Sequence, residues 1–239
     1  NDGKTHTDIY NMAGELVKSI DNLGSETSFE YSNTGAVKST YNVCLDKPDH
    51  KVIEHSYNRY GELESTVDVD AGTWEYDYNT YGELKKQTNS NGTISYLYDK
   101  LGRITNEEIF SSDINETKNI QYDYYETGNG RGQIKAIIQS NNDRKAYEYD
   151  SHGRVEKVNE TINGLTKSLS YSYNAYNALE TVTYSNNIVI QYNYDKYYDL
   201  KTCVRTDVAP HLTLYEAKEY DTQGNLLDRQ VGNGILTYT

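Results

Sequence analysis

Apolar and polar residues alternate over short stretches of this chain, most clearly from Trp74 to Tyr78 and from Ile94 to Tyr98. Because successive side chains of a β-strand point to opposite faces, this period of two is typical of strands with one more apolar face. The alternation continues from Leu63 to Val67 and from Ile134 to Ile138. No helical pattern longer than a turn is present, so the sequence predicts an all-β fold.

A seven-residue phrase separates many of these stretches. It reads Tyr, usually Asp or Asn, two variable residues, usually Gly, one further residue, and then Leu, Ile or Val. Successive copies begin about 23 residues apart, and two strands plus two turns account for that length. The ten copies begin at Tyr10, Tyr31, Tyr57, Tyr78, Tyr98, Tyr124, Tyr149, Tyr173, Tyr194 and Tyr220.

The phrase itself predicts a tight turn between two strands. Asp or Asn suits the first position of a type I turn, and Gly suits the left-handed residue of a following bulge. The Tyr and the Leu, Ile or Val of each phrase should then face each other across the strand ends. The glycines at this position are Gly14, Gly35, Gly61, Gly82, Gly102, Gly153 and Gly224.

A second turn signal precedes several copies, at Ala71-Gly72, Asn91-Gly92 and Asn163-Gly164. Asn-Gly is typical of two-residue hairpin turns. One repeat is therefore predicted to be one β-hairpin plus its connection. Hairpins placed side by side should align the motif tyrosines in a ladder on one face.

Three copies depart from the phrase. Asn177 replaces Gly in the eighth copy, which is a mild change because Asn also adopts the left-handed conformation. Tyr198 replaces Gly in the ninth copy, and a bulky residue resists that conformation, so a different turn geometry is expected there. The sixth copy carries an insertion between Tyr124 and Ile134, which predicts a longer, glycine-rich loop.

The composition argues against disorder and disfavours several classes of binding partner. The 26 tyrosines argue against disorder, because each offers a large apolar face for partial burial. A net charge of -13 disfavours nucleic acid and anionic membranes, and no segment has the 18 apolar residues that membrane insertion requires. Cys44 and Cys203 are expected to be unpaired thiols within strands.

These phrases resemble the YD-repeat, or RHS-repeat, family, and the resemblance covers essentially the whole chain. The family includes bacterial RHS polymorphic toxins, wall-associated proteins, the shell component of Tc toxins, and teneurins. The resemblance implies a spiral β-sheet, or β-solenoid segment, of a hollow shell around a C-terminal toxin or peptide. It also implies a secreted or cell-surface protein whose partners are other parts of the same longer polypeptide.

Residues 1–239 are interpreted as a single array of about ten repeats and as an excerpt of a longer protein. The chain lacks the D-P-x-G-R-x-x-x-x-D-P segment that ends many RHS arrays, and it lacks a C-terminal change in composition. Ten repeats are also too few for a closed shell. The resemblance therefore implies a piece of shell wall without gate or cargo.

No catalytic motif or cofactor motif is recognisable, so no enzyme activity and no cofactor are expected. One cluster could be read as a zinc site, although a solvated connection between two repeats explains it better. The turn Asp and Asn residues could likewise form a calcium-binding ridge, but turn stabilisation explains them without an ion. The cluster consists of Cys44, Asp46, Asp49, His50, His55 and Asp68.

Regularly spaced tyrosines on one face are more often core than a ligand-binding ladder. Aromatics outside the motif tyrosines are better candidates for contact with glycans: Tyr60 and Tyr81 at turn positions, and Trp74 if it faces outward. The sequence thus favours a non-catalytic wall segment that encloses or displays another segment. The alternative is a surface adhesion or carbohydrate-binding module that uses the outer face of the sheet to bind glycans or a cell-surface receptor.

Overall fold

The computed structural model describes residues 6–44, 47–221, 223–232 and 234–237. In this part of the chain the regular elements are all strands, with no helix among them. The chain divides into two compact units, Asn1–Asn119 and Ile120–Thr239. The predicted all-β fold of tandem hairpins is confirmed.

The first unit contains the strands β1 to β10, and β11 spans the boundary. Their bounds are β1 Thr7–Tyr10, β2 Leu16–Ile20, β3 Glu26–Tyr31, β4 Val37–Cys44, β5 Lys47–Tyr57, β6 Leu63–Asp68, β7 Gly72–Tyr78, β8 Leu84–Asn89, β9 Gly92–Tyr98, β10 Ile104–Ser111 and β11 Glu116–Tyr124. The second unit continues with β12 Ile134–Gln139, β13 Arg144–Tyr149, β14 Val155–Ile162, β15 Leu165–Tyr173, β16 Leu179–Tyr184, β17 Val189–Tyr194, β18 Leu200–Arg205, β19 Leu212–Tyr220, β20 Leu226–Val231 and β21 Gly234–Thr237.

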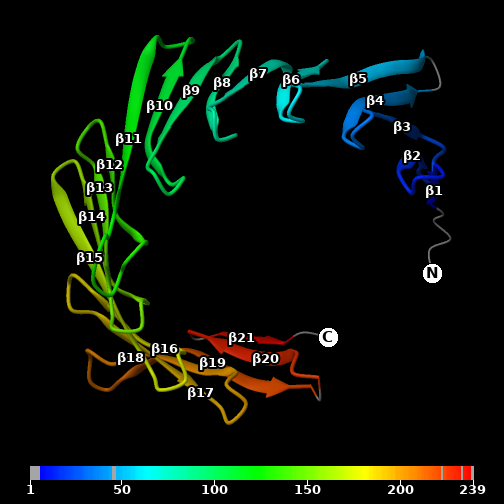
Figure 1. The fold of residues 1–239 in the computed structure, drawn as a ribbon. Helices are drawn as coiled ribbons and strands as arrows, with labels where there is room; N and C mark the ends of the chain where they lie inside the picture. The colour runs from blue at the N-terminus through cyan, green and yellow to red at the C-terminus, as the bar shows by residue number, and fades with distance from the viewer. Residues whose placement is uncertain (1–5, 45–46, 222, 233, 238–239) are drawn as a thin grey trace. The chain divides into compact units, whose positions relative to one another are not determined.

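Within each unit every strand pairs antiparallel with the next strand along the chain. The pairs run from β1–β2 to β9–β10 in the first unit. They run from β11–β12 to β20–β21 in the second unit. Each unit is therefore a meander of hairpins that lie side by side, and strand order follows chain order (Figure 1).

The motif turns have the predicted geometry, as the third copy shows. Gly61 N–H donates to Asn58 O at 3.0 Å, and Asn58 N–H donates to Glu62 O at 2.9 Å. Gly61 has a φ of 82°, and the strand register shifts at Tyr57, which pairs with Leu63. A type I turn followed by a glycine bulge has these features. Positive φ is shared by Gly14, Gly35, Gly61, Gly82, Gly102, Gly153 and Gly224.

The ninth turn keeps this geometry, so the expectation of a different turn at Tyr198 is wrong. Tyr198 has a φ of 69°, and its N–H donates to Asp195 O at 3.2 Å. The ring of Tyr198 lies 4.8 Å from that of Tyr176 in the preceding turn. The backbone hydrogen bonds of the turn and this ring contact offset the steric cost of placing a tyrosine in the left-handed conformation. Asn177 occupies the same position of its own turn with a φ of 65°.

The second class of turn also agrees with the sequence. Asn163 and Gly164 have φ values of 51° and 78°, and Ile162 pairs directly with Leu165. Two central residues with positive φ make a type I′ hairpin turn. The hairpin and its connection thus form the repeating unit, as predicted.

The sixth copy forms the expected longer loop. Tyr125 N–H donates to Gln133 O at 3.0 Å, and Gly132 N–H donates to Tyr125 O at 2.8 Å. Gly130 is buried against the rings of Tyr125 and Tyr149, which meet edge to face with centroids 5.8 Å apart. The loop therefore packs through its backbone onto two aromatic side chains.

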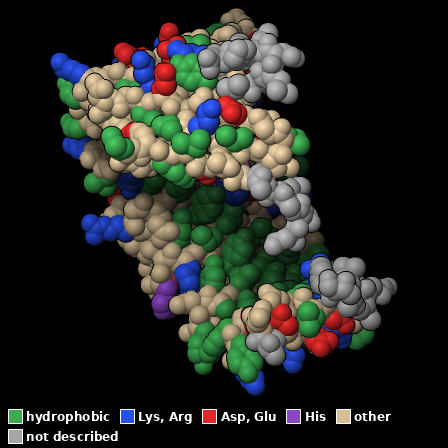
Figure 2. Space-filling view, turned by 90° about the vertical axis from the view of Figure 1, so that its right-hand side faces the viewer, with side chains coloured by type: hydrophobic (Ala, Val, Ile, Leu, Met, Phe, Trp, Pro, Cys, Tyr) green, Lys and Arg blue, Asp and Glu red, His purple; other side chains and the backbone are tan. Residues whose placement is uncertain are grey.

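Few side chains are fully buried, because the sheet is a single layer in each unit. The buried residues among those described are Ser39, Gly130, Ala136, Val182, Ile190 and Ala217. Apolar side chains gather on one face, while many charged side chains lie at its margins (Figure 2). A domain of two packed layers would bury a larger core. Stability must therefore come mainly from contacts within the sheet.

The motif tyrosines supply such contacts between repeats. For seven motif tyrosines the hydroxyl donates to the carbonyl of the residue that pairs with the preceding motif tyrosine. Tyr98 binds Leu84 O at 2.6 Å, for example, and Leu84 itself pairs with Tyr78. Burial, together with the charge of Glu83, raises the pKa of Tyr98. The bonds described are Tyr31 to Leu16, Tyr57 to Val37, Tyr98 to Leu84, Tyr149 to Ile134, Tyr173 to Val155, Tyr194 to Leu179 and Tyr220 to Leu200.

These bonds define a tyrosine ladder along one face, as the sequence predicts. The motif tyrosines from Tyr31 to Tyr220 are half-buried, whereas Tyr10 is 57% exposed. Tyr10 lies on β1, which pairs only with β2 among the described strands. The burial of a motif tyrosine therefore depends on a preceding repeat.

We expect Tyr98→Phe to lower the free energy of unfolding by about 1 kcal/mol, because it removes one hydroxyl-to-carbonyl bond and keeps the ring. Urea denaturation of the chain, followed by circular dichroism, measures this loss. The matched control is Tyr81→Phe, whose side chain is 88% exposed and should change stability little. Equal stability of the two variants would contradict a structural role for the ladder bond.

We expect Gly130→Asn to destabilise the second unit by about 1–3 kcal/mol, because even a Cβ there would lie 2.5 Å from a ring carbon of Tyr149. Gly128→Asn is the control, because Gly128 has a φ of 79° with open space around it, and Asn tolerates that conformation. Thermal unfolding distinguishes the two variants. If both behave alike, the packing against Tyr149 does not limit this position.

Candidate functional site

The second residue of each motif turn holds the turn together. Asn58 Oδ1 accepts backbone N–H groups from Tyr60 at 2.9 Å and from Glu62 at 3.1 Å. Asn58 Nδ2 also donates to Glu62 Oε2 at 2.6 Å. These bonds explain why Asp or Asn recurs here without any ion. The calcium interpretation of these residues stays a prediction.

In five turns the second and sixth residues are matched in hydrogen-bonding type. Where the pair is Asn and Glu, the Asn amide donates to Glu; where it is Asp and Arg, the Asp carboxylate accepts from Arg. Asp99 thus accepts from Arg103 Nε at 2.7 Å. Sequence reasoning missed this rule, although the signal lies in the repeats themselves. The tenth turn has a different pair, in which Asn225 donates to Asp221 at 2.8 Å. The matched pairs are Asn11 with Glu15, Asn58 with Glu62, Asn79 with Glu83, Asp99 with Arg103, and Asp150 with Arg154.

The sixth residue also reaches the next turn along the edge. A Cβ placed on Gly82 would lie 3.0 Å from Glu62 Oε1, so Glu62 occupies the space over that glycine. In the second unit, Gln133 Nε2 donates to Gly153 O at 2.9 Å. The motif turns therefore form a linked row within each unit.

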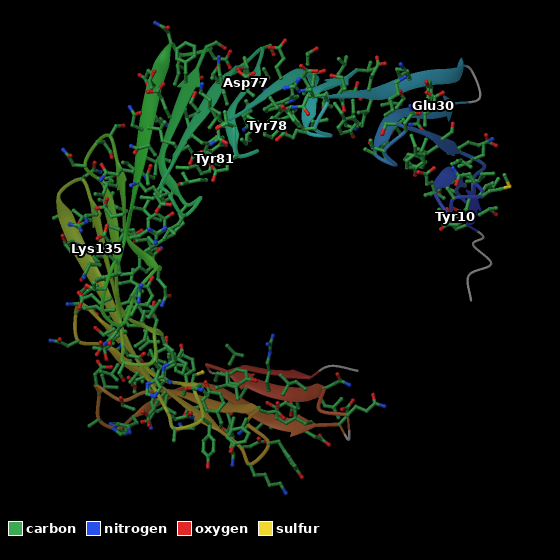
Figure 3. The ribbon with its side chains drawn as sticks, viewed as in Figure 1. Tyr10, Glu30, Asp77, Tyr78, Tyr81 and Lys135 are labelled. Carbon is green, nitrogen blue, oxygen red and sulfur yellow. The ribbon has the colours of Figure 1, made fainter. Side chains whose placement is uncertain are left out.

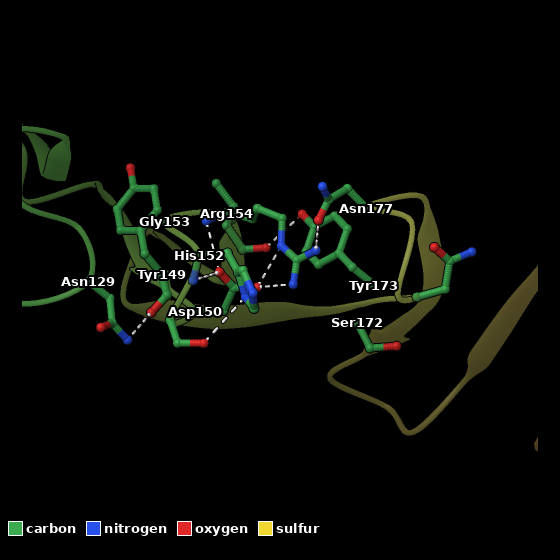
Figure 4. Close-up of polar contacts among 12 residues, drawn as sticks. Asn129, Tyr149, Asp150, His152, Gly153, Arg154, Ser172, Tyr173 and Asn177 are labelled. Carbon is green, nitrogen blue, oxygen red and sulfur yellow. Dashed lines mark hydrogen bonds and ion pairs between the residues drawn. The ribbon is translucent and has the colours of Figure 1, made fainter.

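Arg154 shows the most developed of these links (Figure 4). Its guanidinium forms an ion pair with Asp150 at 2.6 Å, donates to Asn177 Oδ1 at 2.7 Å, and lies 4.4 Å from the ring centroid of Tyr173. Partial burial acts to raise the pKa of Asp150. The hydrogen bonds from Arg154 and from the N–H groups of Arg154 and His152 outweigh it and lower this pKa to about 2.

Two of the three glycan candidates lie at neighbouring turn tips. Tyr60 is 71% exposed and Tyr81 is 88% exposed. Trp74 instead lies half-buried on β7, on the same strand face as Tyr76 and Tyr78. The condition that Trp74 faces outward is therefore not met. Whether any of these residues binds a glycan stays a prediction.

The exposed tips border two successive clefts in the first unit. We name them the Tyr60–Tyr81 cleft, of about 620 Å³, and the Tyr81–Leu101 cleft, of about 660 Å³. Figure 3 labels Tyr78 at the end of β7 and Tyr81 in the turn that follows. Each cleft lies between one motif turn and the next, so the repeat produces it twice.

A third cleft lies on the tyrosine face of the second unit. It has a volume of about 590 Å³ and includes Tyr147, Tyr171 and Tyr184 in its walls. Lys145, Glu160 and Lys167 lie across neighbouring strands at its end, where Glu160 pairs with both lysines in the strand register. The charges at this end therefore alternate and largely offset each other.

The sequence cluster read as a possible zinc site is only partly described. His50 lies within β5 rather than in a loop, and Asp46 lies outside the described residues. The described residues contain no group of three or more His, Cys, Asp or Glu side chains that could hold a metal ion. Of the two cysteines, Cys203 is a free thiol on β18.

One further contact resembles part of a catalytic relay. His6 Nε2 lies 3.1 Å from Ser19 Oγ and 2.9 Å from Asp8 Oδ1. A Ser-His-Asp relay uses one ring nitrogen for Ser and the other for Asp. Since both partners share one nitrogen here, this arrangement lacks the geometry of a relay.

Among the described residues, the structure has no helix with the length and apolar character needed to cross a membrane.

Comparison with known proteins reveals similarity of fold. No protein-family model matches the chain, and its sequence matches no curated protein. The chain is similar to a crystal structure of TcdB2-TccC3 without its hypervariable C-terminal region, with a TM-score of 0.81 and 15% identity over 100% of this chain. The TcdB2-TccC3-TEV crystal structure is similar over 98% of this chain, with a TM-score of 0.60 and 13% identity.

The chain spans only 13% and 12% of the lengths of these two chains. At such low identity the likeness concerns the fold alone. It shows that part of a much longer chain adopts a similar all-β fold.

We expect the carboxyl group of Asp150 to titrate near pH 2 in the native chain, below its ordinary value of 3.8. The stabilisation from ionised Asp150 is therefore fully present above about pH 4 and is lost as the pH falls through about 2. A carbon-13 NMR titration of Asp150 measures the midpoint. Arg154→Gln should raise the midpoint, whereas Arg131→Gln, at an exposed arginine, should not. An unchanged midpoint in Arg154→Gln would contradict the assigned cause.

Proposed function

We propose that this chain is a non-catalytic repeat segment of an RHS-type shell wall. In this proposal it belongs to a longer secreted or cell-surface polypeptide and helps to enclose another segment of that polypeptide. The tyrosine ladder is the observation that carries the proposal. Within each unit the ladder joins hairpins to the preceding ones and lies on a face of half-buried aromatic side chains.

The ladder supports the proposed wall function because its bonding pattern can be repeated from one hairpin to the next. Each copy supplies the carbonyl that the tyrosine of the next copy binds, as Leu84 does for Tyr98 and Val155 does for Tyr173. Stability in such arrays is the sum of repeat and neighbour terms, so copies can be added without redesign. The spread of this bonding pattern over both units favours a role as extended surface rather than as a compact binding domain.

The similar solved structures support the enclosing role. One of them is described as TcdB2-TccC3 without its hypervariable C-terminal region, so the protein from which that chain derives carries such a region in addition to this fold. Within the proposal, the segment enclosed by the present chain's array is likewise part of the same polypeptide. No catalytic group is required for this role, and none of the contacts described above is assigned to chemistry.

The test is protection of the enclosed segment from a protease. A specific cleavage site is inserted beyond residue 239 in the longer polypeptide, and its cleavage is followed under native conditions. We expect the site to be cleaved at least tenfold more slowly than in the denatured polypeptide, because opening of the wall is needed for access.

The combination of Tyr149→Ala, Tyr173→Ala and Tyr194→Ala should accelerate cleavage, because it removes three ladder bonds and their rings. The matched control combines Tyr60→Ala, Tyr81→Ala and Tyr197→Ala at exposed turn tips and should retain protection. Rapid cleavage of the native polypeptide with an intact ladder would refute enclosure.

A further inference from the structure

Tyr176 and Tyr198 form an exposed tyrosine pair at two successive motif turns of the second unit. Tyr176 is the fourth residue of the turn between β15 and β16, and Tyr198 is the fifth residue of the turn between β17 and β18. Their ring centroids lie 4.8 Å apart, with an angle of 57° between the ring planes. The contact joins different repeats, so it depends on the folded arrangement of the hairpins.

The backbone is held in place at both tyrosines. Asn174 Oδ1 accepts the N–H of Tyr176 at 2.9 Å, and Asp195 O accepts the N–H of Tyr198 at 3.2 Å. Each ring therefore extends from a fixed point of its turn. Two groups that are held together in one geometry react far more readily than two groups that must first meet.

Tyr198 occupies its position at a conformational cost. It has a φ of 69° at a position that is glycine in most motif turns and asparagine in the eighth. A residue in such a strained conformation persists only where its surroundings hold it, and such residues cluster at functional sites. Glycine would form the same turn without strain but would leave Tyr176 without its ring partner. The left-handed tyrosine thus provides a contact that the turn itself does not need.

The pair is also open to solvent. Tyr176 is 69% exposed and Tyr198 is 52% exposed, so a reagent in solution can reach both rings. The side chain of Tyr176 raises the pKa of Tyr198, so the polar ends of the two side chains interact as well as their rings.

A second tyrosine pair in the same unit provides an internal comparison. The rings of Tyr125 and Tyr149 meet edge to face with centroids 5.8 Å apart, but both side chains are half-buried. Their hydroxyls donate to backbone carbonyls at 3.0 Å and 2.8 Å. This pair is therefore committed to packing, whereas Tyr176 and Tyr198 are accessible.

We propose that Tyr176 and Tyr198 form an oxidative modification site, at which a one-electron oxidant joins the two rings by a carbon–carbon bond. The oxidant is of the class of a haem peroxidase acting with hydrogen peroxide. This modification does not depend on the proposed wall function. It requires only the turns between β15 and β16 and between β17 and β18.

The reaction balances without any other reactant. Each phenol gives one electron to the oxidant and one proton to water, and the two radicals pair through ring carbons adjacent to the hydroxyl-bearing carbons. The hydrogen on each bonded carbon then moves as a proton to the phenol oxygen, which restores both aromatic rings. Hydrogen peroxide takes up the two electrons and two protons and becomes two water molecules. The tyrosine pair thus loses two hydrogen atoms in total.

The link has a physical consequence for the array. It closes a loop between the eighth and ninth copies of the motif, which restricts the unfolded chain and so stabilises the folded one. The two successive turns are then joined covalently as well as by ring contact. We therefore expect the cross-linked chain to unfold at a higher temperature than the untreated chain.

The test is oxidation of the intact chain by a haem peroxidase with hydrogen peroxide, followed by proteolytic digestion and mass spectrometry. We expect a linked peptide pair that contains Tyr176 and Tyr198 and is lighter than the sum of its parts by two hydrogen atoms. Its yield should be about tenfold above that of any other tyrosine pair, because the folded chain holds these rings together. The yield per chain should stay constant on dilution, which separates coupling within a chain from coupling between chains.

Variants that lack one phenol hydroxyl identify the partners. Tyr198→Phe and Tyr176→Phe each keep a ring but remove the O–H group that must be oxidised, so each should abolish the link. The matched control is Tyr197→Phe, at the 71% exposed neighbour of Tyr198, which should give the native yield. Circular dichroism of each variant checks the fold.

The same arrangement can be transferred to the first unit. Tyr60 has the position in its turn that Tyr176 has, and Gly82 has that of Tyr198. Glu62 occupies the space over Gly82, whereas the corresponding residue of the eighth copy is alanine. We expect Gly82→Tyr combined with Glu62→Ala to add a second link, to Tyr60, while Glu62→Ala alone adds none. A chain that carries both changes and gains no link would contradict the turn geometry as the cause of coupling.

Several results would overturn the proposal. Equal yields from Tyr198→Phe and Tyr197→Phe would do so, and so would a yield that rises with chain concentration. An unchanged preference for this pair in urea-denatured chain would show that the fold does not direct the coupling. Absence of the linked peptide from the oxidised native chain would also overturn it.

Discussion

The bond from a tyrosine hydroxyl to a backbone carbonyl one repeat away is the interaction on which the rest of the structure depends. A single-layer sheet cannot bury a conventional core, and only six described residues are buried. Each tyrosine offsets this deficit, because its ring covers its neighbours and its hydroxyl satisfies a carbonyl. Tyrosine, which has both an apolar ring and a polar hydroxyl, is therefore the residue type that stabilises this sheet.

Much of the fold could be predicted, because turn chemistry is local. Gly61 and Asn58 specify their turn through backbone conformation and bonds within five residues, and sequence reasoning reads such patterns well. The Tyr57 to Val37 bond joins residues far apart in the chain. The phrase predicted a tyrosine ladder, but not the acceptor, because the acceptor depends on the register between hairpins.

Tyr198 shows where local reasoning fails. A left-handed tyrosine is unfavourable by itself, and this was the basis for expecting a different turn. The ring of Tyr176, one repeat earlier, supplies a contact that exists only when the two turns are adjacent. The side chain of Tyr176 also raises the pKa of Tyr198. In a repeat array, a neighbour can thus offset a local conformational cost.

The position of a residue in the repeat also decides whether its side chain can contact a partner. Because the motif turns other than the sixth share one backbone conformation, the chemical differences between them lie in the variable residues around it. The candidates for glycan contact were found from such positions, but Trp74 lies on the tyrosine face, since strand parity rather than residue type decides its direction. The Tyr60–Tyr81 cleft and the Tyr81–Leu101 cleft have one shape and different charges. A repeat array can therefore carry several distinct recognition sites on one wall without any change of fold.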